Sequence, residues 1–348
     1  MSAQPHVRGR NRRQAALIGV PLALGIVLVA ALVRYITQTG EPAAPPRAQA
    51  TPTAAPVKAE PVFDPSAGAA LPTSRVVAYY AVPGAAATGP AYRLGADMLA
   101  RLKDQAAQYQ ALDPAHPVVA GIDLVVSVPD RYPGPVGTYS HHVDKATIDS
   151  YVEFCRANGL VLFLDLNFGW TDPLTELNAF ADYLKLPFVH VAVDPEWMFP
   201  RRNGIPGENL SNVRAADLNP LIQAVAEMPA QYHVPRKMFI IHQYRPDGDD
   251  LTDPYNPGKA LIADKRNLVN DSRVDVVVHV DSVGGWDGDI ETKTEQYNDW
   301  VAQGMQRYGN FRYGGFKIFY QLESKHRLMT PAEVMALQPP PMVITYGN

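Results

Sequence analysis

The chain has 348 residues, of which 47% are hydrophobic and 19% are charged, and its formal net charge is −4. This composition excludes a disordered chain and a protein with many membrane spans, and the lack of a basic excess argues against a nucleic-acid-binding protein. The single cysteine, Cys155, excludes an intramolecular disulfide and a cysteine-based zinc site.

The first feature along the chain is a run of 19 residues without a charged side chain, residues 15–33. As a helix rising ~1.5 Å per residue, this run is long enough to span the hydrocarbon core of a membrane. Four arginines precede it and only Arg34 follows closely. The positive-inside rule therefore predicts a cytoplasmic basic tail over residues 1–14, a single transmembrane anchor over residues 15–35 and an extracytoplasmic remainder. A cleaved signal peptide is the alternative.

A segment rich in proline and alanine follows the apolar run. Residues 41–72 contain 8 prolines and 10 alanines, a composition that buries no core and favours extended polyproline II. We therefore predict a disordered linker over residues 36–72 and a folded domain over residues 73–348. Residues 1–72 carry 7 basic and 3 acidic side chains, and the rest of the chain carries 24 basic and 32 acidic ones. The folded domain is thus acidic, which disfavours nucleic acids and other anionic polymers as ligands.

Eight short apolar runs recur along the folded domain, each bounded by turn-forming residues. They are residues 76–82, 120–128, 160–167, 188–194, 237–243, 274–280, 315–321 and 342–346. Most are almost continuously apolar, which is typical of parallel strands buried on both faces. Helical patterns lie between them, over residues 91–110, 145–158, 173–184, 218–228, 256–268, 292–308 and 331–337.

Eight strands alternating with helices in about 276 residues predict an α/β fold, the (β/α)8 TIM barrel. An open, doubly wound parallel sheet is the alternative. No strand, however, is followed by the glycine-rich nucleotide loop that is typical of the open sheet.

The C-terminal ends of barrel strands, with the loops after them, form the active sites of TIM barrels. In this chain polar and aromatic residues stand at those ends on strand after strand, as a polar, ring-shaped ligand such as a sugar requires. The predicted ligand-binding residues are Tyr80, Asp165, Asn167, Trp197, His242, Gln243, Asp281, Tyr320, Gln321 and Glu323.

The most specific local feature is the pair Asp194 and Glu196 at the end of the fourth strand. Side chains two residues apart on a strand point the same way, with Cα atoms ~6.5–7 Å apart, so both carboxylates face one pocket. Their repulsion raises one pKa and keeps that group protonated as a general acid. We predict Glu196 as the acid and Asp194 as the ionised carboxylate that stabilises positive charge at an anomeric carbon. The structural alternative is that Asp194 caps the next segment and Glu196 is a solvated loop residue.

The sequence Val-Ala-Val-Asp-Pro-Glu-Trp over residues 191–197 resembles the strand-4 Asp-x-Glu signature of the chitinase-like and lysozyme-like barrel glycoside hydrolases. The resemblance implies that Glu196 is the general acid and Asp194 the assisting carboxylate, often with the N-acetyl group of the substrate as nucleophile. The chitinase-like pattern has a further Asp and a Gly where this chain has Ala192 and His190. The likeness is therefore at the level of the superfamily. The chain also looks like membrane-tethered bacterial barrel proteins that have no assigned activity.

A metal-dependent hydrolase is a second interpretation of the same strand ends. His242, His279, Asp281, Asp165 and Glu196 are residue types that bind metals. No His-x-His follows the first strand, however, and no Lys ends the fourth, so the usual pattern of amidohydrolase-type barrels is missing. We therefore expect no metal and no cofactor.

These observations predict a membrane-anchored, extracytoplasmic, glycoside-hydrolase-like barrel that acts on a cell-wall or extracellular glycan by carboxylate acid/base catalysis. Its expected partners are that glycan and, through residues 15–35, the cell membrane, and not nucleic acid. The alternative is a non-catalytic glycan-binding or cell-surface-binding protein on the same fold, in which Glu196 is turned to solvent.

Overall fold

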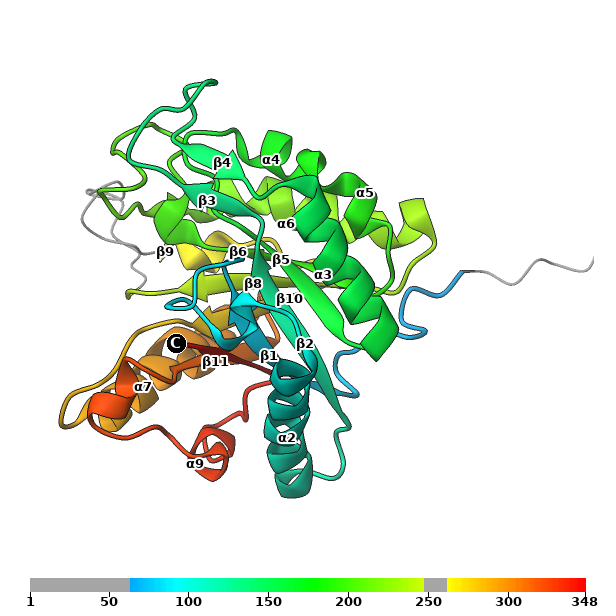
Figure 1. The fold of residues 1–348 in the computed structure, drawn as a ribbon, viewed down its shortest axis with the longest axis vertical. Helices are drawn as coiled ribbons and strands as arrows, with labels where there is room; N and C mark the ends of the chain where they lie inside the picture. The colour runs from blue at the N-terminus through cyan, green and yellow to red at the C-terminus, as the bar shows by residue number, and fades with distance from the viewer. Residues whose placement is uncertain (1–62, 247–261) are drawn as a thin grey trace, which may run out of the picture. The chain divides into compact units, whose positions relative to one another are not determined.

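The computed structural model describes residues 63–246 and 262–348, which form a closed barrel of eight parallel strands (Figure 1). The strand order around the barrel is β1, β2, β5, β6, β8, β10, β11 and β12, and β12 closes the ring by pairing with β1. Their bounds are β1 Arg75–Ala81, β2 Val118–Val125, β5 Val161–Leu166, β6 Val189–Val193, β8 Lys237–Gln243, β10 Val274–Val280, β11 Tyr313–Phe319 and β12 Val343–Gly347. Closure excludes the open sheet, so the predicted TIM-like barrel is confirmed.

Each of the eight strands begins within two residues of its predicted start, and β8 and β10 match the prediction at both ends. Two further sheets of two strands each lie outside the barrel. One is the antiparallel pair β3 Ser127–Pro129 and β4 Ser140–His142, and the other is the parallel pair β7 Val213–Arg214 and β9 Ile262–Ala263.

The helices cover the outside of the barrel, and local sequence explains several of their ends. The Asp144 carboxylate accepts a hydrogen bond from the backbone N–H of Thr147 and so begins α3, while Gly159, at a left-handed φ of 65°, ends it. Helices α2 and α9 lie against each other (Figure 1). The helical bounds are η1 Pro90–Tyr92, α2 Ala96–Leu112, α3 Lys145–Asn158, α4 Pro173–Ala179, α5 Ala181–Leu184, η2 Pro195–Trp197, α6 Ala215–Tyr232, η3 Lys265–Asn267, α7 Asp289–Tyr297, the π-helical η4 Asn298–Ala302, α8 Gln303–Tyr308, η5 Glu323–Lys325 and α9 Pro331–Met335.

One predicted helix, over residues 256–268, is wrong where the structure describes it. Residues 262–268 form the short strand β9 and the single turn η3 instead. The physical reason is a pairing that is distant in sequence: β9 hydrogen-bonds to β7, and Asp264 then turns the chain with a left-handed φ of 49°. Residues 256–261 lie outside the described part of the chain.

Apolar side chains fill the N-terminal part of the barrel interior, and a larger apolar cluster lies between the strands and the surrounding helices. The interior layer contains Val76, Ala78, Val161, Phe163, Ala192, Met238, Ile240, Val277 and Val343. Leu71, which precedes β1, joins this layer and is buried. The sequence predicts residues 63–72 as linker, but the carbonyls of Pro65 and Leu71 accept hydrogen bonds from Arg236. These two residues therefore pack against the barrel, although they precede the predicted domain boundary at residue 73.

Among the described residues, no helix is long and apolar enough to cross a membrane. The predicted basic tail over residues 1–14, the predicted anchor over residues 15–35 and residues 36–62 of the predicted linker all lie outside the described part of the chain. The anchor and the cellular location therefore stay predictions.

Candidate functional site

A layer of polar side chains lies inside the barrel directly beyond its apolar layer, at the C-terminal ends of the strands. On five strands a polar residue stands two positions after an apolar interior residue and so points the same way. These five are Tyr80, Asp165, Asp194, His242 and His279. Asp123 pairs with Tyr80 across β1 and β2, and Lys317 on β11 pairs with Thr345 on β12, so the polar layer extends around the barrel. With the Asp281 carboxylate, which reaches His242, we call Tyr80, Asp123, Asp165, His242, His279, Asp281 and Lys317 the polar cluster.

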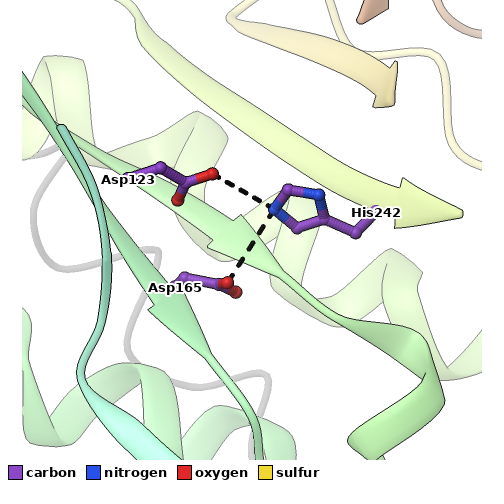
Figure 2. A group of neighbouring side chains, drawn as sticks. All are labelled: Asp123, Asp165 and His242. Atoms are coloured by element: carbon purple, nitrogen blue, oxygen red, sulfur yellow. Dashed lines mark ion pairs between the residues drawn. The ribbon is translucent and has the colours of Figure 1, made fainter. Parts of the chain in front are cut away.

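His242 stands at the centre of the polar cluster and is surrounded by carboxylates (Figure 2). Its Nε2 atom lies 3.4 Å from Asp123 Oδ2 and 3.8 Å from Asp165 Oδ2, and its Nδ1 atom lies 3.4 Å from Asp281 Oδ2. Burial opposes a charge on the imidazole, but the three carboxylates outweigh burial and raise the pKa of His242. The ring of His279 lies beside it, with the centroids 4.9 Å apart, and burial lowers the pKa of His279 well below its ordinary value.

Lys317 is the fixed cation of the polar cluster. Its Nζ atom lies 2.9 Å from Asp281 Oδ2 and 3.7 Å from the centre of the Tyr80 ring. The Tyr80 hydroxyl in turn donates a 3.1 Å hydrogen bond to Asp165 Oδ2. Burial opposes the charge on Lys317, but the surrounding carboxylates, Asp281 first among them, raise its pKa. These contacts join β1, β5, β10 and β11 through buried side chains, which gives the cluster a defined geometry.

Asp194 and Glu196 form a carboxylate pair beside the polar cluster, directly after β6. Asp194 is buried, whereas Glu196, in the turn η2, is partly exposed. The Oε2 atom of Glu196 is nevertheless buried, and it has no hydrogen-bond partner among the described residues. Asp194 precedes η2, but its side chain does not cap that turn. Both predicted structural roles, a capping Asp194 and a fully solvated Glu196, therefore differ from the observed placement.

The environment of the carboxylate pair favours the protonated forms. Burial, followed by the nearby Asp281 carboxylate, raises the pKa of Glu196 to about 8. Burial and then the neighbouring Glu196 raise the pKa of Asp194 well above its ordinary value. Because the Glu196 carboxylate raises the pKa of Asp194, the two groups do not titrate independently. This differs in part from the expectation that Asp194 stays ionised beside a protonated Glu196.

The remaining predicted ligand-binding residues do not form one group: some are buried and others are partly or fully exposed. Asn167 follows β5 and is buried, with its side-chain oxygen unpartnered within the described chain. Trp197 is partly exposed in η2. Gln243 points away from His242 and accepts a hydrogen bond from Lys265. Tyr320 stacks on another tyrosine of the outer layer, and its hydroxyl donates to Gln105 on α2, while Gln321 is exposed.

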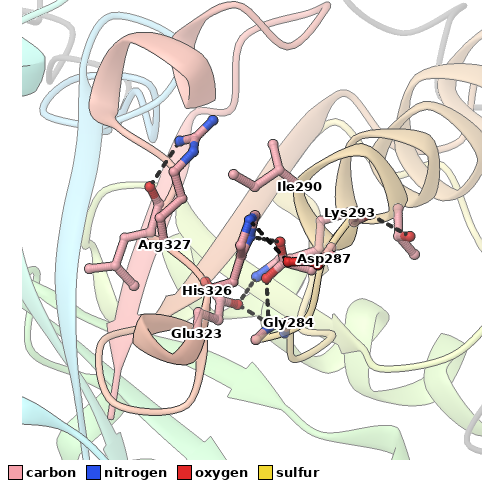
Figure 3. A network of polar contacts seen from close by, with 12 residues as sticks. Gly284, Asp287, Ile290, Lys293, Glu323, His326 and Arg327 are labelled. Carbon is pink, nitrogen blue, oxygen red and sulfur yellow. Dashed lines mark hydrogen bonds and ion pairs between the residues drawn. The ribbon is translucent and has the colours of Figure 1, made fainter.

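Glu323 lies in a separate buried network that joins the loops after β10 and β11 (Figure 3). Its carboxylate forms an ion pair with Lys293 on α7 and accepts a hydrogen bond from the backbone N–H of Gly284. Lys293 also donates to the backbone carbonyl of Lys317, 2.8 Å away. His326 adds an ion pair with Asp289, at 2.9 Å. Through Lys293, Glu323 therefore supports the strand that carries Lys317.

Two members of the polar cluster, Asp123 and Lys317, escaped prediction from the sequence. Both lie in the middle of otherwise apolar runs, in Ile-Asp-Leu and Phe-Lys-Ile. A charged residue inside a strand that is buried on both faces was the available signal, because such a charge requires a partner.

The fold and the site thus define a parallel α/β barrel with a buried polar cluster at the C-terminal end of its strands. No protein-family model and no curated protein matches the chain.

Proposed function

We propose that the chain is a glycoside hydrolase that acts on a cell-wall or extracellular glycan. The observation that carries this proposal is the placement of Glu196 next to Asp194 at the C-terminal end of β6, with one buried and unpartnered carboxyl oxygen among the described residues. A pKa of about 8 keeps the proton on Glu196 at neutral pH, as a general acid requires. The resemblance of residues 191–197 to the Asp-x-Glu signature of barrel glycoside hydrolases supports the same assignment.

In the proposed reaction, Glu196 donates its proton to the glycosidic oxygen while the bond from that oxygen to the anomeric carbon breaks. Positive charge then develops on the sugar ring, and nearby carboxylates stabilise it. Asp281, held in its ion pair with Lys317, supplies one such charge. Glu196, which has given up its one proton, supplies another. Water then adds to the anomeric carbon, and its second proton returns to the pair, which restores the starting state.

The proposal includes a cellular location. The charge-free run over residues 15–33 and the arginines before it support a membrane anchor with the barrel on the extracytoplasmic side. A glycan outside the cytoplasmic membrane is the substrate class that fits this placement.

The test is hydrolysis of a panel of peptidoglycan, chitin-type and β-glucan polymers by the full chain, with released reducing ends as the readout. We expect one glycan class to be cleaved, and Glu196→Gln, which keeps the shape of the side chain without an ionisable proton, to lower the rate at least ~100-fold. Glu295→Gln, an exposed position on α7, is the matched control and should leave the rate unchanged.

Two results would refute the proposal. Equal rates for Glu196→Gln and the unmodified chain would remove Glu196 from the reaction. Saturable binding of a glycan without cleavage would instead support the alternative, a non-catalytic glycan-binding protein on this fold.

A further inference from the structure

We propose that Asp123, Asp165 and His242 bind one divalent first-row transition-metal ion inside the barrel. These residues lie on β2, β5 and β8, apart from the Asp194 and Glu196 pair, so the inference stands independently of the proposed function. The absence of the amidohydrolase pattern led to the expectation of no metal, and Asp123, which is not part of that pattern, is the ligand that changes it.

The three side chains lie close enough together to bind one ion. One ligand atom from each of the three residues can be chosen so that all three atoms lie within 4.8 Å of one another. In a tetrahedral site with metal–ligand bonds of ~2.1 Å, neighbouring ligand atoms are about 3.4 Å apart. His242 Nε2 lies 3.4 Å from Asp123 Oδ2 and 3.8 Å from Asp165 Oδ2 (Figure 2). These distances are longer than an ordinary hydrogen bond. They are close to the distance expected between two neighbouring ligand atoms of one metal ion.

Most polar side-chain atoms of the three residues lack a hydrogen-bond partner in the part of the chain that the structure describes. All three side chains are fully buried. Yet both oxygens of Asp123, Oδ1 of Asp165 and both ring nitrogens of His242 have no hydrogen-bond partner among the described residues. A protonated imidazole at this position would have ion pairs at 3.4 Å from both ring nitrogens, which are longer than ordinary hydrogen bonds and so compensate only part of the cost of burial. A metal ion on Nε2 would also bind one oxygen atom of each aspartate, and so give a partner to all three side chains.

Neighbouring side chains orient two of the three ligands. A histidine that binds a metal usually donates its other ring N–H to a carboxylate, which fixes the tautomer. Asp281 Oδ2 stands 3.4 Å from His242 Nδ1 and is itself held by Lys317. The hydroxyl of Tyr80 likewise orients Asp165 by donating to its Oδ2 atom. Each of these two ligands therefore has a carboxylate or hydroxyl neighbour from another part of the barrel, Asp281 directly after β10 and Tyr80 on β1.

The charges of the two aspartates also fit a divalent cation. Asp123 and Asp165 together carry two negative charges when ionised, and Lys317 is already paired with Asp281. A divalent cation would neutralise these two charges. The proton on the separate pair of Asp194 and Glu196 would not be needed for this. The donor set of one imidazole and two carboxylates, without a thiolate, suits Zn²⁺ or Mn²⁺ better than copper(I) or calcium.

The test uses the full chain without a histidine tag, stripped of metal with a chelator and then titrated with ZnCl₂ by calorimetry. We expect one Zn²⁺ per chain. Asp123→Asn and His242→Gln should lower the affinity by more than ~100-fold, and Asp281→Asn, which removes only the outer partner, by ~10–100-fold. His190→Gln is the matched control, because His190 is equally buried but lies at the other end of the same barrel, where its Nδ1 accepts from Met238. That variant should retain the affinity.

Loss of folding in a variant is detected by circular dichroism, and visible absorption of the Co²⁺-loaded unmodified chain gives a second readout that needs no substitution. A d–d band from one bound Co²⁺ that Zn²⁺ displaces supports the proposal. Less than half an equivalent of Zn²⁺ on the unmodified chain overturns it, as does unchanged affinity in folded Asp123→Asn and His242→Gln. In those cases His242 is an ion-paired imidazolium only. The glycan assay with Glu196→Gln is unaffected by either outcome, so the two proposals can fail separately.

Discussion

Replacing Glu196 with glutamine should stabilise the protein, and the stabilisation should depend on pH. Glutamate ordinarily has a pKa of 4.5, whereas burial and the nearby Asp281 raise that of Glu196 to about 8. Between these values the folded chain holds a proton that the unfolded chain releases, so stability falls as pH rises from 4.5 through about 8. At pH 7 this difference corresponds to ~3 kcal/mol, and the partial exposure of Glu196 reduces it to ~2 kcal/mol.

Glutamine does not ionise, so Glu196→Gln avoids this cost. We expect the variant to match the unmodified chain near pH 4 and to exceed its free energy of unfolding by ~2 kcal/mol at pH 7, with no further gain above about pH 8.5. Other charged groups act electrostatically on Glu196 or titrate with it, namely Asp194, Asp281, His242, Lys317 and Arg245. They are present in both chains, so the difference between the two curves of stability against pH removes most of their own contribution.

Urea unfolding from pH 4 to pH 9, with a chelator present to exclude metal binding, measures this difference. The exposed substitution Glu295→Gln should give a flat difference across the same range. A Glu196→Gln chain that is less stable than the unmodified one at pH 8, or a difference that does not vary with pH, would refute the reasoning. In either case Glu196 is not a buried acid.

Three further predictions concern the barrel itself. Lys293→Met should destabilise the chain by ~3–5 kcal/mol in urea, because it leaves the buried carboxylate of Glu323 unpaired; replacing both residues with apolar ones should recover part of the loss. Gly315→Ala should cost at least ~3 kcal/mol, since its Cβ would lie 2.2 Å from the buried histidine ring on β10, whereas Gly95→Ala, in open space, should cost no more than ~1 kcal/mol. Cys155 is buried, with its pKa raised to about 12, so a disulfide reagent should label it only after unfolding; rapid labelling of the native chain would contradict that burial.

The barrel was predictable because each of its strands has a recognisable local sequence pattern. Runs such as residues 237–243 and 274–280 are short, rich in apolar and β-branched residues, and bounded by turn-forming residues, and the structure makes β8 and β10 at those positions. The number of runs then determined the fold class. Residues 262–268 were not predictable in the same way. Their conformation depends on pairing with β7, almost fifty residues earlier, and a local pattern carries no information about such a partner.

The composition of the site was less predictable than its location. In a strand buried on both faces, the apolar pattern does not show which side faces the barrel interior. His242 and Gln243 are both polar and adjacent, yet His242 points inward to three carboxylates while Gln243 points outward to Lys265. The same ambiguity placed Tyr320 among the predicted ligand-binding residues, although its hydroxyl reaches α2. Asp123 was missed for the opposite reason, because it lies within an apolar run and not at its end.

Buried charged side chains at the two ends of the barrel differ in their hydrogen bonding. This difference indicates that the polar cluster has a function other than packing. At the N-terminal end, the ammonium of Lys237 donates to the carbonyls of Leu186 and Val189, and Arg75 donates to a carbonyl and to Asp113. These charges have hydrogen-bond partners, as structural charges normally do.

At the C-terminal end, Asp123 and His242 are fully buried and form an ion pair at 3.4 Å, but within the described chain their side-chain polar atoms have no hydrogen bond. Burial of this kind lowers stability unless something else binds there, and a protein that used these residues only for packing would be more stable with apolar side chains. Departures from the rules of stability are expected where a chain binds or reacts with a ligand. The unsatisfied end is also the end at which TIM barrels carry their active sites. A bound cation between Asp123, Asp165 and His242, and a sugar above Glu196, would each supply partners that the described residues do not.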